Sequence, residues 1–169
     1  MTHSPRQITS PFEPGTLVVL IGPGGSGKSQ YARTFPDSWV VCLDDLRECV
    51  SDDAGDQSAT ADAVALQNLL TRARLSRSLT TVMDSTNVEP RLRGDLIDQA
   101  RQHGRPVAAV IFLTELVTCE TRNVQRPANR RVPTSVLRRQ HAQTLAAIPL
   151  LAGEGFTDIR TAGSRPPPG

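Results

Sequence analysis

The chain has almost no lysine and few aromatic residues. Of its 19 basic residues one is a lysine, Lys28, which leaves 18 arginines. Its aromatic residues are one Trp, one Tyr and four Phe, too few for a surface that binds nucleic acid mainly by stacking on bases. Surface lysines exchange freely with arginine, so a composition bias explains the arginines. The one retained lysine then marks a position where a compact point charge is required.

Cysteine is also scarce, and long apolar runs are missing. Cys42, Cys49 and Cys119 are an odd number without a C-x-x-C pair, which argues against a disulfide framework or a zinc site and for a reducing cytoplasm. No apolar stretch approaches membrane-spanning length, and the N-terminus has no signal-peptide pattern. A net charge of +2 over 169 residues excludes a general nucleic-acid-coating surface. We therefore expect one cytoplasmic domain without a membrane partner.

Lys28 lies in a glycine-rich octet that follows an apolar run. The octet, GPGGSGKS, fits the phosphate-binding pattern G-x-x-x-x-G-K-[ST], and residues 17–21 before it read as a buried strand. In this motif the backbone N–H groups surround a phosphate, the lysine reaches the β- and γ-phosphates, and the serine hydroxyl is a ligand of Mg²⁺. We expect a nucleoside triphosphate such as ATP, with Mg²⁺, to bind at Gly22, Gly24, Gly25, Ser26, Gly27, Lys28 and Ser29.

A dinucleotide-binding motif is the alternative. Gly22, Gly24 and Gly27 fit G-x-G-x-x-G, and Asp44 lies near the distance of a ribose-binding acid. Lys28 and Ser29 have no task in that motif, and the chain is short for two mononucleotide-binding halves. The arginines of 122–131 also suit a transferred phosphoryl group better than a nicotinamide.

Apolar runs alternate with helical patterns along the chain. The pattern predicts an α/β fold with helices on both faces of a mainly parallel sheet of about five strands. The predicted strands are 17–22, 39–43, 80–83, 107–113 and a short edge strand at 157–160, and the predicted helices are 27–35, 59–77, 90–103, 114–123 and 133–147. Residues 1–15 read as a loose lead-in, 16–162 as the domain and 163–169 as a disordered proline-rich tail.

Acidic residues follow two of the predicted strands. Asp44 comes directly after 39–43, with Arg47 one helical turn onward, and Asp84 comes directly after 80–83. At the carboxyl ends of parallel strands, Asp44 could accept a proton from a hydroxyl group, while Arg47 orients it or holds an acceptor phosphate. Asp84 could act on Mg²⁺ through water or brace an arginine. Helix capping by Asp44 and an Asx turn at Asp84 are the structural alternatives.

A cluster of arginines occupies residues 122–131. Arg122 and Arg126 share one helix face by their spacing of four, and Pro127 then favours a loop for Arg130 and Arg131. Arginines on a mobile segment that closes over ATP can neutralise charge on the transferred phosphoryl group. A solvated basic face is the alternative.

The order of these elements resembles the P-loop kinase domain of polynucleotide 5′-hydroxyl kinases, the end-healing enzymes of bacteria and phage. The resemblance covers residues 17–160. It rests on the phosphate loop, Asp44-x-x-Arg47, residues 51–57, Asp84-Ser85-Thr86-Asn87-Val88, Arg122-Asn123 with Arg126, and Glu154-Gly155-Phe156. It implies a three-layer P-loop kinase fold with an arginine-bearing helical lid over residues 114–147. The phosphatase and ligase modules that often accompany such kinases have no room here.

The resemblance also implies roles for individual residues. Lys28 and Ser29 would serve ATP and Mg²⁺, and Asp44 would be the general base for a 5′-OH. Arg47, Asp84 and Asn87 would lie on the acceptor side, with Asp84 as a further Mg²⁺ ligand through water. Arg122, Arg126 and either Arg130 or Arg131 would contact the ATP phosphates, and Arg126 would join Lys28, Asp44 and Arg47 in catalysis.

Three functions remain open from the sequence. The first is an ATP-dependent kinase acting on the 5′-OH end of RNA or DNA, bound mainly through phosphates. The second is a kinase of the same fold acting on a small hydroxyl compound such as an antibiotic, a nucleotide sugar or a nucleoside. The third is a nucleotide-binding regulator without transferase activity, for which an acid facing the acceptor would have no purpose.

Overall fold

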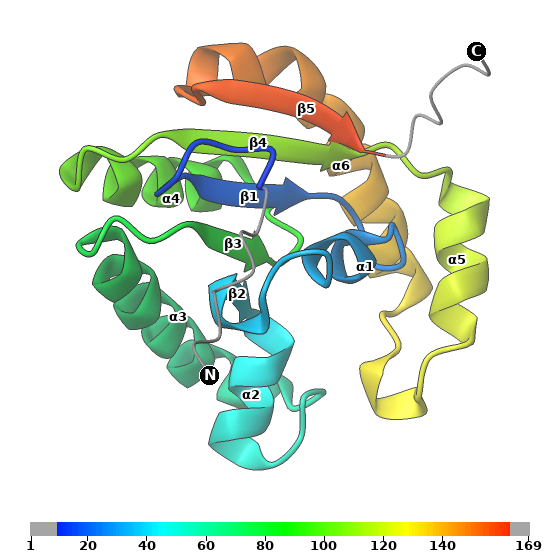
Figure 1. The fold of residues 1–169 in the computed structure, drawn as a ribbon. Helices are drawn as coiled ribbons and strands as arrows, with labels where there is room; N and C mark the ends of the chain where they lie inside the picture. Colours follow the sequence, from blue (N-terminus) through cyan, green and yellow to red (C-terminus); the bar gives the residue numbers. More distant parts are fainter. Residues whose placement is uncertain (1–9, 163–169) are drawn as a thin grey trace, which may run out of the picture.

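A five-stranded sheet organises the chain (Figure 1). The computed structural model describes residues 10–162. The strand order is β2-β3-β1-β4-β5 and every pairing is parallel. The predicted α/β fold with a parallel sheet is therefore confirmed. The strands are β1 (Leu17–Ile21), β2 (Val40–Cys42), β3 (Thr81–Asp84), β4 (Val107–Phe112) and β5 (Asp158–Ala162).

The central strand β1 divides the core into two apolar layers. All five of its side chains are buried, as expected for a parallel sheet covered on both faces. Leu17, Val19 and Ile21 face a layer that contains residues of α3, α4 and α6. Val18 and Leu20 face the opposite layer, which contains Ala32 and Phe35. Alternate residues of one strand thus anchor the helices on both sides of the sheet.

Between residues 10 and 162, six helices of at least five residues surround the sheet. They are α1 (Lys28–Ala32), α2 (Leu43–Ser51), α3 (Thr60–Leu75), α4 (Pro90–Gln102), α5 (Leu116–Val124) and α6 (Thr134–Glu154). Short 3₁₀ turns occupy Asp37–Trp39, Gln57–Ala59 and Ala128–Arg130. Pro90 lies in the first turn of α4, and Gly104 follows its end with a positive φ of 61°. Both positions agree with the sequence prediction.

The sequence prediction misses one helix and misplaces the ends of two others by three residues or more. No predicted helix corresponds to α2, which begins at Leu43, the last residue of the predicted strand 39–43. The first helix ends at Ala32, three residues before the predicted end. Helix α6 continues through Pro149 to Glu154, beyond the predicted end at 147, because Ala147 and Leu151 pack into the core.

The start of the described chain is anchored. Phe12 is buried, its ring stacks on Phe35, and the Arg160 guanidinium lies 4.3 Å from its centroid. The lead-in predicted over 1–15 thus includes at least one packed residue, Phe12, and residues 1–9 lie outside the described range. The tail predicted at 163–169 also lies outside it. Between residues 10 and 162, no helix has the length and apolar character needed to cross a bilayer.

Candidate active site

The phosphate loop connects β1 to α1. Gly25 and Gly27 have φ values of 77° and 101°, in the left-handed region that favours glycine. The Gly22 N–H donates to the Thr86 carbonyl at 3.0 Å, which ties the loop to the chain after β3. Because helix α1, which follows the loop, has only five residues, the shape of the phosphate-binding loop depends mainly on its glycines and on this bond.

Lys28 is buried inside this loop. Its ammonium donates to the carbonyl oxygens of Gly22 at 2.8 Å and Pro23 at 2.7 Å. Burial lowers the pKa of Lys28 from 10.5 to about 8, and the nearby Asp84 carboxylate opposes this shift. The lysine thus lies ready for a phosphate, held by its own loop.

Ser29 and Asp84 form the second polar group of the loop. Burial raises the pKa of Asp84, and the nearby Ser29 side chain and the Lys28 ammonium oppose this shift. Mg²⁺ in nucleotide sites takes one or two protein oxygens and completes its shell with phosphates and water. The Ser29 hydroxyl and Asp84 carboxylate fit that donor set. No group of three or more His, Cys, Asp or Glu side chains suited to a metal occurs between residues 10 and 162, and Mg²⁺ at a nucleotide does not need one.

Two neighbouring cavities lie beside the phosphate loop. One of about 240 Å³ is lined by Gly25, Gly27, Lys28, Ser29, Gln30, Arg122 and Arg126. The other, of about 610 Å³, continues past Gly27, Tyr31 and Thr34 to Phe112, Leu113, Thr114 and Ala162. The first has the size and charge for phosphates, and the second has the mixed polar and aromatic lining of a nucleoside site.

Asp44 belongs to α2, which follows β2. In the sheet, β1 and its phosphate loop lie between β2 and β4, the strand that ends in Phe112. Asp44 is the second residue of its helix and makes no cap contact, so the capping alternative is wrong. Its carboxylate binds the Arg47 guanidinium and lies 3.7 Å from Arg130. The side chain of Asp44 is 43% exposed. A half-exposed carboxylate held by arginines is available to an incoming hydroxyl group.

Arg47 is buried and reaches two partners. Its Nε donates to the Ala54 carbonyl at 3.0 Å and its Nη2 binds Asp44. Of the two roles predicted for Arg47, orienting Asp44 has a contact in the structure. A contact with an acceptor phosphate stays a prediction.

The four lid arginines have different surroundings. Arg122 donates to the Gly25 carbonyl at 3.1 Å and, with Arg126, lines the phosphate-sized cavity. Arg130 faces Asp44, whereas Arg131 donates to the Arg126 carbonyl at 2.8 Å. Helix α5 ends at Val124, so the loop predicted before Arg130 is present.

Asn87 points into the fold. It is buried, has a φ of 47°, and its amide donates to the Leu20 carbonyl at 2.8 Å and to the Ser85 carbonyl at 3.2 Å. These bonds hold the ends of β1 and β3 together. We therefore assign Asn87 a positioning role rather than a contact with the acceptor.

Several site contacts had no signal in the sequence. Gln140 of α6 accepts from the Gly24 N–H at 3.1 Å, and the Thr114 hydroxyl donates to the Ser26 carbonyl at 2.8 Å. Arg93, fully buried, donates to Glu154 and to the carbonyls of Asn87 and Val88. Gln140 and Arg93 belong to no motif that would identify them in the sequence. Thr114 follows β4, and its place after a strand is the one signal that could have identified it.

The fold and the loop define a class. A parallel sheet of order 2-3-1-4-5, with a lysine-bearing phosphate loop after the central strand, is the architecture of P-loop nucleotide-binding domains with a kinase-like lid. A model of the AAA domain family matches residues 17–151, and the chain belongs to this family. The resemblance to P-loop kinases is thereby confirmed for family and fold, and the kinase-like fold supports a phosphotransferase.

Solved structures share this fold. A chain of the Pnkp1/Rnl/Hen1 RNA repair complex is 23% identical with a TM-score of 0.67, over 85% of this chain and 47% of that one. A candidate kinase from Chloroflexus aurantiacus is 14% identical with a TM-score of 0.62, over 88% of each chain. The PezAT toxin–antitoxin system of Streptococcus pneumoniae matches at 16% identity and a TM-score of 0.57, over 94% of this chain and 72% of that one.

The chain thus spans about half of the repair-complex chain that it matches. No curated protein matched this chain at a significant level.

Proposed function

We propose that the protein is an ATP-dependent kinase that transfers the γ-phosphoryl group to the 5′-OH end of RNA or DNA. The observation that carries this proposal is the carboxylate of Asp44, held by Arg47 and facing Arg130. A module that only binds a nucleotide needs no such acid. The likeness to a chain of an RNA repair complex supports a polynucleotide as the acceptor.

The donor would bind on the phosphate-loop side. Its β- and γ-phosphates would replace the Gly22 and Pro23 carbonyls as partners of Lys28, and Arg122 and Arg126 would contact phosphate oxygens across the 240 Å³ cavity. Ser29 and Asp84 would hold Mg²⁺, which balances charge on the phosphates when bound. The nucleoside would occupy the larger cavity beside Tyr31 and Phe112.

The acceptor would enter on the side of α2. Its hydroxyl oxygen forms a bond to the γ-phosphorus while the bond from that phosphorus to the β-phosphate oxygen breaks, and the hydroxyl proton passes to Asp44. Arg47 would keep the carboxylate oriented, and a contact of its guanidinium with the first acceptor phosphate is part of this proposal. Arg126 and Arg130 stabilise charge on the transferred group.

The test is label transfer from γ-labelled ATP with Mg²⁺ to RNA and DNA oligonucleotides with a 5′-OH. The same oligonucleotides with a 5′-phosphate are the blocked control. Asp44→Asn removes the proton acceptor and keeps the shape, so transfer should fall by about 100-fold or more while ATP binding persists. Glu48→Gln, exposed one turn along α2, is the matched control and should retain wild-type transfer. Absence of label on every oligonucleotide, with ATP still bound, excludes a polynucleotide acceptor.

The position of the aromatic residues favours a second candidate, a kinase of a small hydroxyl compound. Five aromatic rings contact one another in stacked, tilted and edge-to-face pairs: Phe12, Tyr31, Phe35, Trp39 and Phe112. The sixth aromatic, Phe156, packs against the core. None of the six is therefore available beside Asp44 to stack an acceptor base. Phosphorylation of a small hydroxyl compound, with oligonucleotides unlabelled, would establish this candidate.

A further inference from the structure

The turn of the lid touches the loop that follows α2. Asn129, in the 3₁₀ turn between α5 and α6, donates its side-chain N–H to the Asp53 carboxylate at 2.9 Å. In Figure 1 this turn is drawn in yellow and α2 in cyan, both on the lower side of the molecule. The two residues are 76 positions apart in the chain, so this bond joins the lid turn to a distant loop.

The same carboxylate shapes the loop that receives the lid. Asp53 Oδ1 also accepts from the Gly55 N–H at 2.8 Å. A Cβ atom at position 55 would overlap the Asn129 carbonyl oxygen, with Asp53 Oδ1 a further 3.2 Å neighbour. Gly55 therefore leaves the space in which the backbone of the lid turn sits.

Both halves of this contact connect to catalytic candidates. On one side Arg47, which binds Asp44, donates to the Ala54 carbonyl at 3.0 Å. On the other side Arg131 donates to the Arg126 carbonyl at 2.8 Å.

The lid turn also has a fixed shape of its own. Asn123 brackets it, because its amide binds both the N–H and the carbonyl of Val132, at 3.0 and 2.7 Å. A contact at residue 129 therefore fixes the neighbouring lid arginines relative to the carboxylate of Asp44.

We propose that Asp53, Gly55 and Asn129 form a lid latch that selects the acceptor hydroxyl over water. The three are positioning residues, and their role rests on the kinase function proposed above. With the latch closed, the lid covers the side of Asp44 and holds Arg130 against it. With the latch open, water reaches the γ-phosphorus and its oxygen forms the new bond, while the bond to the β-phosphate oxygen breaks. The water proton passes to Asp44, and ADP and inorganic phosphate leave.

Reciprocal exchange of the two latch side chains tests the proposal. Asn129→Asp places two carboxylates together and should open the latch, whereas Asp53→Asn keeps an oxygen for Gly55 and should act weakly. The double variant Asp53→Asn/Asn129→Asp restores a donor and an acceptor with the order reversed. We expect Asn129→Asp to raise the acceptor KM and the ratio of ATP hydrolysis to transfer about fivefold, and the double variant to recover most of both.

Two controls separate the latch from charge and from folding. Gln125→Glu adds the same charge to the lid at an exposed residue, and should leave the ratio unchanged. Gly55→Ala should raise the ratio as Asn129→Asp does, while Gly94→Ala, whose new Cβ meets nothing within 4 Å, should not. Equal effects of Asn129→Asp and Gln125→Glu, or no recovery in the double variant, would overturn the latch.

Amide hydrogen exchange gives a readout that does not depend on the acceptor. Residues 53–57 and 127–131 should lose protection in Asn129→Asp and regain it in the double variant. If protection follows this pattern while no acceptor is phosphorylated, the contact stands and the proposed reaction fails. Unchanged protection in Asn129→Asp would overturn the latch even in an active kinase.

Discussion

Among single residues, Lys28 has the most altered environment. Its ammonium has little water around it and is held by two carbonyl oxygens of its own loop. Burial lowers its pKa to about 8. Since the phosphates of a bound nucleotide favour the charged form, binding should return the pKa of this amine toward its ordinary value.

A pH dependence of nucleotide binding is the consequence. Above pH 8, Lys28 of the free protein has largely lost its proton. Nucleotide binding must then be accompanied by uptake of a proton from solution, so the affinity for the nucleotide should fall as the pH rises through about 8. Calorimetry at about pH 8.5 in two buffers of different ionisation enthalpy should show uptake of roughly half to one proton per ATP. Lys28→Arg, which stays charged, is the control and should remove the uptake. Uptake that persists in this variant would assign the proton to another group.

The sequence identified the site residues that belong to local patterns. Lys28 and Ser29 follow from an eight-residue motif after an apolar strand, and Asp84 from its place at a strand end. Asn129 and Arg93 could not be identified in this way, because their partners, Asp53 and Glu154, lie 76 and 61 positions away. A polar residue whose role depends on a distant partner has no signature in its own neighbourhood.

Among the helices, α6 departs most from its prediction. Proline in a helix interior removes one hydrogen bond and disfavours the preceding turn, so an end before Pro149 was the natural expectation. The helix continues because burial of Ala147 and Leu151 and the pairing of Glu154 outweigh that penalty. Tertiary packing decides the length of this helix.

Replacement of Pro149 should therefore stabilise the protein. Pro149→Ala restores a backbone N–H inside α6, and we expect the free energy of unfolding to rise by about 1 kcal/mol. Urea denaturation followed by circular dichroism measures this change. Pro133→Ala is the matched control, since Pro133 precedes the same helix where proline is well tolerated. A decrease in stability with Pro149→Ala would contradict this expectation.

Helix α3 illustrates the limit of periodicity. The apolar residues at helical spacing predicted the helix correctly, but Val64, Leu66, Leu69 and Leu70 are all at least 38% exposed. The buried positions are Ala63, Thr71 and Leu75.

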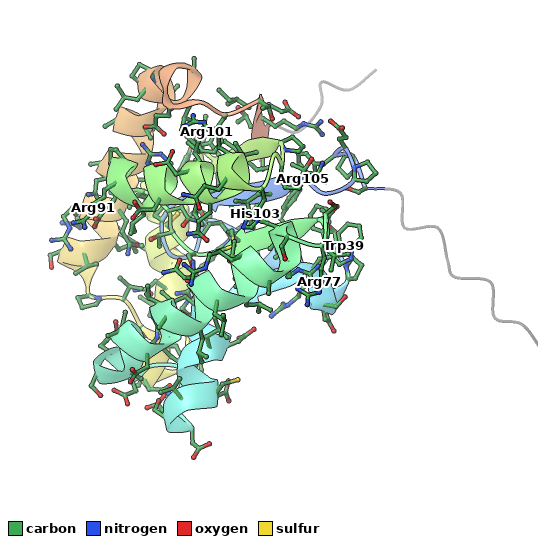
Figure 2. The ribbon with its side chains drawn as sticks, turned by 90° about the vertical axis from the view of Figure 1, so that its left-hand side faces the viewer. Trp39, Arg77, Arg91, Arg101, His103 and Arg105 are labelled. Carbon is green, nitrogen blue, oxygen red and sulfur yellow. The ribbon has the colours of Figure 1, made fainter. Side chains whose placement is uncertain are left out.

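Figure 2 shows α3 and α4 side by side on one face of the molecule, with Arg77, Arg101 and Arg105 labelled on this face, away from the lid. Their position away from the lid agrees with the prediction that a composition bias explains most of the arginines.

At the scale of the whole molecule, one ion pair joins the end of α6 to α4 and to the chain that follows β3. Arg93, fully buried in α4, donates to both carboxylate oxygens of Glu154 at 2.7 and 2.5 Å. It also binds the carbonyls of Asn87 and Val88 at 3.1 and 2.7 Å. The C-terminal end of α6 is thereby fixed to the chain that follows Asp84.

Loss of one partner of this pair should be worse than loss of both. Glu154→Ala leaves the Arg93 charge buried and uncompensated, and we expect a loss of about 3–5 kcal/mol. The double variant Arg93→Met/Glu154→Leu should lose less, because no buried charge remains. Urea unfolding of the three proteins measures both values. Arg101→Ala, which breaks an exposed pair with Asp98, should change stability by under about 1 kcal/mol. A larger loss in the double variant would show that the pair is a net source of stability.

The sequence predicted the fold class of the molecule but not its strand order. Alternation of apolar strands with helices leads directly to a parallel sheet. Which strands are neighbours depends on contacts such as β1 with β3 and β4, and a pattern read along one chain does not contain them.

The lone lysine makes this site chemically addressable. The chain has one ε-amine, it lines the phosphate-sized cavity, and its pKa of about 8 leaves part of it unprotonated and nucleophilic near neutral pH. A nucleotide analogue with an aldehyde on its phosphate chain would meet a single side-chain amine and form one imine. A chain with one lysine thus offers one side-chain amine to a covalent probe, and this amine lies in the nucleotide-phosphate cavity.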